Sequence, residues 1–136
     1  MLRQRSRPYL FSNSIPPMVA AAGIEALNIM QNSNDLQDKL HANTEYFVSK
    51  MKAAGFDIKP TESAICAVML YDAKLSQDMA AAMMKEGIYV TGFYYPVVPK
   101  GQARIRVQIS AAHEREHLDK CIAAFTKIGK EFGVLK

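Results

Sequence analysis

The sequence predicts an α/β domain of two layers (α+β), in which a small, mainly antiparallel sheet carries its helices on one face. The first observation is the order of the expected elements, which runs helix, helix, strand, helix, strand, strand, helix. The second is a continuous apolar run at 64–70, typical of a buried central strand. The third is an alternating strand at 104–110. The expected helices are too few to cover both faces of the sheet. The polar row of the alternating strand should therefore lie on the uncovered face.

The composition is that of a single soluble domain. The 136 residues are 49% apolar and 22% charged, which allows a sizeable core without metal or disulfide. Cys66 and Cys121 lie far apart in apolar runs, so we expect two buried free thiols in a reducing compartment. The sequence lacks the apolar run of a signal peptide and any stretch long enough to span a membrane.

The chain is expected to consist of an irregular arm at 1–14 and a domain at 15–136. The arm contains Arg3, Arg5 and Arg7. A basic arm can bind nucleic acid or anionic lipid, but no RNA- or DNA-binding signature follows, so we interpret it as a solvated segment near a domain junction. Ser14 should cap a helix that continues to about Met30, with prolines in its first turn.

Four further segments complete the expected layout. A helix after residue 34 should place Leu36, Leu40, Phe47 and Met51 on one face and end at Gly55. A short edge strand is expected at 56–58. A helix at 72–86 should bury Leu75, Met79 and Met83, followed by a strand at 88–93 and a loop with two prolines at 94–101. The last helix, at 114–132, should bury Leu118, Cys121, Ile122, Phe125 and Ile128.

Arg106 is the first candidate functional residue, because it lies mid-strand on the polar row. A guanidinium in a central strand needs a partner, and its planar fork matches a carboxylate. The pattern alone leaves two interpretations open. One is a salt bridge with helix residues of this domain, and the other is a carboxylate on another domain or on a ligand.

Two other places carry groups that can do chemistry. Ser12 and Asn13, with Ser14, precede an expected helix start, where they can form a simple N-cap or receive a phosphate. His113 follows the last strand, where it can act as an acid or base or make a structural hydrogen bond. No glycine-rich phosphate loop, paired-carboxylate site or metal motif is present in the sequence.

Two stretches resemble a known family. They are 5–14, RSRPYLFSNS, and 95–113, YPVVPKGQARIRVQISAAH. Together they are similar to the α-oxoamine synthases, which are fold-type I enzymes dependent on pyridoxal 5'-phosphate (PLP). The resemblance runs along the whole chain, and the second stretch is long and specific.

The resemblance implies a C-terminal small domain of an acyltransferase that acts as a homodimer. The sequence of the segment Tyr95–Gly101 is most similar to the same segment in family members that condense glycine with acetyl-CoA to 2-amino-3-oxobutyrate. These members act in threonine catabolism. Arg106 matches the arginine that binds the substrate carboxylate. Ser12 and Asn13 match the segment that contacts the cofactor phosphate of the partner subunit. Such an enzyme is cytoplasmic, or in the mitochondrial matrix in a eukaryote, and binds neither nucleic acid nor membrane.

The chain departs from the family in one respect. The lysine that binds the cofactor covalently lies upstream of the arm in the family, in a large domain, and no lysine here has the matching context. We therefore expect no catalytic residue in this chain, and the chain alone to be inactive. Two alternatives stay open: a sister synthase of the 8-amino-7-oxononanoate or 5-aminolevulinate type, and a stand-alone α/β binding module.

Overall fold

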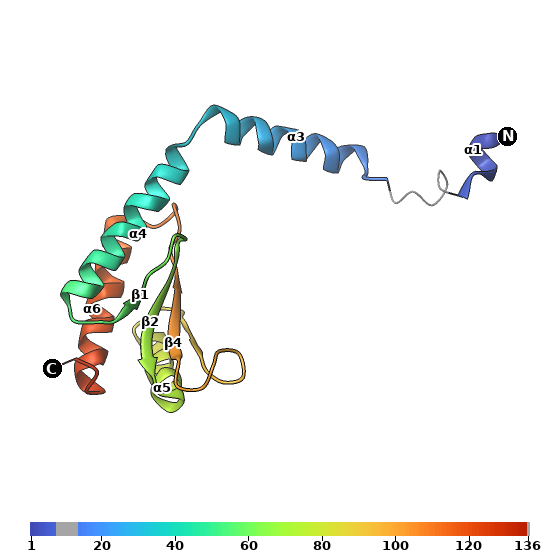
Figure 1. Cartoon of the computed structure of the whole chain (residues 1–136). Helices are drawn as coiled ribbons and strands as arrows, with labels where there is room; N and C mark the ends of the chain where they lie inside the picture. Colours follow the sequence, from blue (N-terminus) through green and yellow to red (C-terminus); the bar gives the residue numbers. More distant parts are fainter. Residues whose placement is uncertain (8–13, 136) are drawn as a thin grey trace. The chain divides into compact units, whose positions relative to one another are not determined.

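The computed structural model describes residues 1–7 and 14–135, and it divides the chain into two compact units, Met1–Asp35 and Leu36–Lys136. The first unit contains α1 (Leu2–Arg5) and α3 (Pro17–Asn32), and the second contains the sheet and the remaining helices (Figure 1). Within the described residues, no helix has both the length and the apolar character needed to cross a bilayer.

The first unit differs from the sequence prediction at two points. The arm is not wholly irregular, since α1 forms one helical turn closed by a 3.2 Å hydrogen bond from the Gln4 amide to the Met1 carbonyl. Ser14 does not cap α3. Pro16 occupies that position with φ −56° and ψ 142°, because a residue before proline is driven to extended backbone. Ser12 and Asn13 lie outside the described residues.

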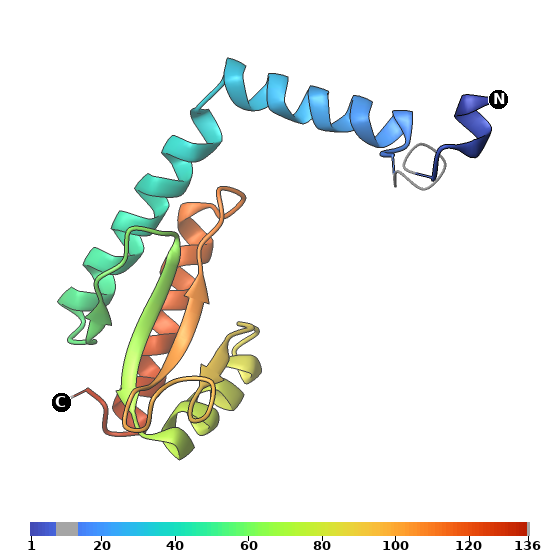
Figure 2. The same cartoon turned by 45° about the vertical axis from the view of Figure 1, so that its right-hand side comes forward.

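The second unit has the predicted two layers. Its four strands pair antiparallel in the order β1-β2-β4-β3; they are β1 (Ile58–Lys59), β2 (Ile65–Tyr71), β3 (Thr91–Phe93) and β4 (Ala103–Gln108). The helices α4 (Asp35–Ala53), α5 (Ala73–Lys85) and α6 (Arg115–Glu131) pack on one face, and Figure 2 shows α6 behind β2 and β4. The predicted fold class is confirmed.

The strands β1 and β3 begin later than the sequence indicates, for the same reason in both cases. Gly55 and Gly87 end the preceding helices with φ of +100° and +76°. The next residues then close the helix ends: the Phe56 amide donates to the Met51 carbonyl at 3.1 Å, and the Ile88 amide to the Met83 carbonyl at 3.0 Å. Because these amides are committed to the helices, pairing starts only beyond them.

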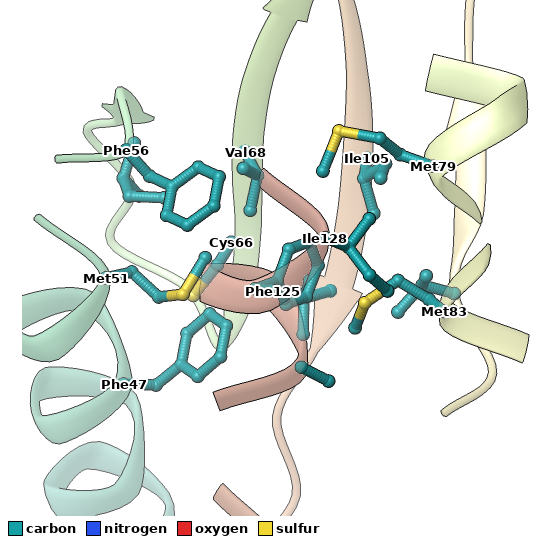
Figure 3. Packing of buried hydrophobic residues seen from close by; sticks show 14 of the residues in the cluster. Phe47, Met51, Phe56, Cys66, Val68, Met79, Met83, Ile105, Phe125 and Ile128 are labelled. Carbon is teal, nitrogen blue, oxygen red and sulfur yellow. The ribbon is translucent and has the colours of Figure 1, made fainter. Parts of the chain in front are cut away.

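The core lies between the sheet and the three helices. In Figure 3, Phe125 and Ile128 of α6 lie between the α4 side chains and the α5 side chains. The predicted apolar faces of α5 and α6 are confirmed, although Leu75, Cys121 and Ile122 are only half-buried. Leu36, on the predicted apolar face of α4, is nevertheless 69% exposed, because α4 extends beyond the end of the sheet (Figure 2).

The opposite face of the sheet is open, as predicted. Along β4, Ala103, Ile105 and Val107 are buried toward the helices, and the alternate side chains are half-buried or exposed. Those alternate side chains are Arg104, Arg106 and Gln108. The alternation read from the sequence therefore places the polar row on the face without helices.

Candidate functional site

Arg106 lies at the centre of the open face. Its backbone is in register with Ala67 of β2 and Thr91 of β3. Paired residues of antiparallel strands project to the same face, so its neighbours on both sides are small and uncharged. None of the three ion pairs found among the described residues includes Arg106. The salt bridge with helix residues, one of the two interpretations of the sequence, is thus absent from the described part of the chain.

A cavity of about 390 Å³ lies beside Arg106 on this face. Its wall is mostly apolar and includes two guanidinium groups; the lining residues are Ile65, Ala67, Phe93, Val97, Val98, Arg104 and Arg106. Two cations in a mostly apolar wall favour a small anionic ligand, because a guanidinium fork binds a carboxylate through two parallel hydrogen bonds.

The loop at 94–101 closes one side of this cavity. The Val97 and Val98 amides both donate to the Tyr94 carbonyl, at 2.9 and 3.2 Å, so the chain turns back toward the sheet. Val98 is buried by this turn, while Val97 is exposed. Lys100 lies with its Nζ 5.0 Å from the centre of the Tyr95 ring. Val97 and Val98, the two adjacent valines of the loop, therefore both lie in the cavity wall.

Phe93 is a contact that the sequence reasoning missed. The guanidinium carbon of Arg106 lies 4.6 Å from the centre of the Phe93 ring, within the range of a cation–π interaction. The alternation of the strand ending at Phe93 places Thr91 and Phe93 on one face. The register that brings Phe93 to Arg106 could be learned only from the structure.

His113 makes a structural hydrogen bond, one of the two roles open from the sequence. Its Nδ1 accepts a 3.2 Å hydrogen bond from the Ser110 amide, which turns the chain after β4. Asn43, buried on α4, donates from Nδ2 to the carbonyls of Ser110 and His113, at 3.2 and 2.8 Å. The sequence reasoning missed Asn43 as well, although an asparagine inside the apolar stripe between Leu40 and Phe47 was a readable signal.

The two cysteines are poor nucleophiles in the folded chain. Both are free; Cys66 is buried and Cys121 half-buried. Burial raises the pKa of each thiol to about 11. Since the thiolate is the reactive form, neither thiol suits nucleophilic catalysis near neutral pH.

We expect iodoacetamide to modify both thiols slowly at pH 8 in the native chain and quickly in urea. Their raised pKa values also predict that stability falls as pH rises from about 9 toward about 11, because the unfolded thiols ionise first. Mass spectrometry of timed aliquots measures the modification. Rapid native labelling of either cysteine would contradict the burial argument.

The family model for class I and II aminotransferases matches residues 1–125, which include both motif stretches and Arg106. The chain belongs to this family. The resemblance inferred from the sequence is confirmed, and the structure adds where the two stretches lie: 95–113 forms the loop, β4 and the turn after it, and 5–14 falls mostly outside the described residues.

Individual relatives refine the comparison. The chain is 54% identical over 135 residues to the mitochondrial 2-amino-3-ketobutyrate coenzyme A ligase of Mus musculus, covering 99% of this chain and 32% of the relative. It is 48% identical over 134 residues to the 8-amino-7-oxononanoate synthase of Petrotoga mobilis, covering 98% of this chain and 34% of the relative. The chain spans about a third of the length of these curated relatives.

A solved structure shows the same fold. A single-residue variant of the serine palmitoyltransferase of S. paucimobilis, solved with a bound PLP–myriocin aldimine, superposes with a TM-score of 0.80 at 30% identity. The match covers 98% of this chain and 34% of that chain. The small sheet with helices on one face thus also occurs as about a third of that longer chain.

Proposed function

We propose that this chain is the part of a PLP-dependent glycine C-acetyltransferase that binds the carboxylate of glycine. The reaction joins the α-carbon of glycine to the carbonyl carbon of acetyl-CoA. The α-proton leaves, the thioester C–S bond breaks, and CoA departs as the thiol, which gives 2-amino-3-oxobutyrate. The similarity to 2-amino-3-ketobutyrate coenzyme A ligase supports this reaction.

The observation that carries the proposal is the Arg106 guanidinium on the open face. It lines a cavity and has no carboxylate partner within the described residues. The carboxylate of glycine supplies the missing partner. A two-point contact with that carboxylate fixes the orientation of the substrate, which is a large part of what an enzyme gains from binding.

The donor set fits an amino-acid carboxylate, and PLP itself would contact other residues. PLP, when bound, supplies the electron sink that allows the α-proton of glycine to leave. Ser12 and Asn13 would contact the cofactor phosphate of the partner subunit through their hydroxyl and amide groups. The lysine that binds the cofactor covalently would belong to the part of the relatives that this chain does not span, so the 136 residues alone would be inactive.

The surface of α3 supports a place in a larger, homodimeric protein. The helix has no buried residue and exposes several large apolar side chains, including Met18 at 72% and Met30 at 69%. Surfaces of this kind mark contacts with other protein. The full protein would act in threonine catabolism, in the cytoplasm or, in a eukaryote, in the mitochondrial matrix. The mouse relative is a mitochondrial protein by name.

A second candidate is a sister synthase that uses alanine and a longer acyl thioester. The 48% identity to 8-amino-7-oxononanoate synthase favours it as the alternative. It shares the carboxylate contact at Arg106, because every such amino acid carries the same carboxylate. The two candidates therefore differ in the amino-acid side chain and the acyl group.

The test is a substrate comparison in the full-length protein loaded with PLP. CoA release is followed with a thiol reagent for glycine with acetyl-CoA and for alanine with longer acyl thioesters. We expect kcat/KM for the first pair to be higher by at least about tenfold, on the order of one methyl group in a fitted pocket. The reverse preference would assign the sister activity, and turnover by the 136-residue chain alone would contradict both assignments.

A further inference from the structure

We propose that Phe93 is a positioning residue that holds the Arg106 guanidinium ready for the substrate carboxylate. The inference rests on the proposed role of Arg106 and adds a residue that the motif comparison does not assign. Phe93 is half-buried at the end of β3 and lines the same cavity as Arg106.

The Phe93 ring is the cation–π partner that the sheet provides for Arg106. The residues directly opposite Arg106 are Ala67 and Thr91, and neither carries charge. Phe93 pairs with Arg104, which makes it the diagonal neighbour of Arg106 on the same face. Diagonal neighbours in an antiparallel pair are within reach of long and aromatic side chains, and the 4.6 Å distance shows that this contact is made.

A ring holds an arginine in a way that suits ligand binding. The ring attracts the flat face of the guanidinium, whereas the N–H donors lie in the guanidinium plane at its edge. A carboxylate from the protein would also fix the side chain, but it would occupy those donors. Phe93 restricts the conformations of Arg106 and leaves its donors for the substrate.

Restricting Arg106 has a consequence for binding. An exposed arginine has many rotamers, and ordering it on a ligand lowers the affinity. Arg104 adds positive charge on the same face, half-buried and outside the ion pairs found among the described residues. The Phe93 ring thus orders the Arg106 fork before substrate arrives, in a cavity wall that already favours an anion.

The experiment compares Phe93→Leu with Phe93→Tyr in the full-length, PLP-loaded protein. Calorimetry gives the affinities for glycine and for glycinamide, which lacks the carboxylate, and steady-state assays give KM for acetyl-CoA. We expect Phe93→Leu to weaken glycine by about tenfold, the effect of a partly desolvated cation–π contact. Glycinamide affinity and the KM for acetyl-CoA should stay unchanged, and Phe93→Tyr, which keeps the ring, should bind glycine like the parent.

The Arg106→Ala background separates this inference from the proposed function. There the glycine preference over glycinamide should be lost, and adding Phe93→Leu should change nothing further. If Arg106→Ala keeps that preference, the proposed function fails. If Arg106→Ala loses it but Phe93→Leu does not weaken glycine, only the positioning role fails.

A general structural role for Phe93 predicts a different pattern. It would weaken glycine and glycinamide equally, and it would persist in the Arg106→Ala background; either result overturns the inference. Should Phe93→Leu fail to fold, as judged by thermal melting, Phe93→Met fills more of the same volume without a ring. The glycine and glycinamide affinities of Phe93→Met are then judged by the same criteria.

Discussion

Replacing Arg106 by alanine in the full-length protein is expected to lower kcat/KM for glycine by about a thousandfold. This corresponds to about 4 kcal/mol, the order of a buried, charge-assisted contact whose partner is left unpaired. The substrate carboxylate would then sit in a cavity whose wall is mostly apolar and keeps Arg104 as its cation. Steady-state kinetics with glycine varied at saturating acetyl-CoA measures the loss, and the KM for acetyl-CoA should change little.

Two variants control this experiment. Arg106→Lys keeps the charge but loses the planar fork, so it should recover only part of the activity. Gln108→Ala alters the next exposed side chain on the same face of β4 and should keep kcat/KM near that of the parent. An Arg106→Ala variant with unchanged glycine kinetics would remove Arg106 from the site.

The open face illustrates what the sequence could predict. A strand places successive side chains on opposite faces, so the run Ala103–Gln108 fixes which residues face the helices once the buried set is known. The small number of helices then indicates that only the face with the buried side chains is covered, so the opposite face stays open. Arg106 could be placed on the open face by these two local facts, without knowledge of strand order.

Other features depend on pairings between distant residues, which a single sequence does not contain. Phe93 reaches Arg106 only because β3 pairs beside β4 in one particular register. The two amide contacts from Asn43 to the turn after β4 join residues separated by 67 and 70 positions. The register of β3 is therefore the geometric variable on which the site depends.

Gly92 is the residue that sets how closely β3 and α5 approach. It lies between Thr91 and Phe93 and faces the helix layer. A Cβ built on Gly92 would lie 2.6 Å from the carbonyl oxygen and 2.9 Å from the carbonyl carbon of Ser76. Both are backbone atoms of α5, which cannot rotate away as a side chain can. Because Gly92 has no side chain, β3 can lie close to α5 on the helix-covered face of the sheet. In that position, β3 presents Phe93 on the open face.

Gly92→Ala is expected to lower the free energy of unfolding of the sheet unit by about 2–3 kcal/mol, the usual cost of an added methyl group in a packed interior. Because Ser76 is itself fully buried, α5 must shift as a whole to relieve the overlap. Urea denaturation of the 136-residue chain, followed by far-UV circular dichroism, measures the loss. Hydrogen exchange should show that amides of α5 and β3 lose protection first.

Gly23→Ala makes the same chemical change where it meets no obstacle. Gly23 lies within α3, and a Cβ there has nothing within 4 Å. Alanine favours a helix over glycine by about 1 kcal/mol, so this variant should leave the unfolding of the sheet unit unchanged and raise helicity slightly. If both variants left that unfolding unchanged, α5 could move away from β3 at little cost. The close approach of Gly92 to α5 would then not be what determines the position of Phe93. The contact between the Phe93 ring and Arg106 would still be made, but its geometry would have to depend on the pairing of β3 with β4.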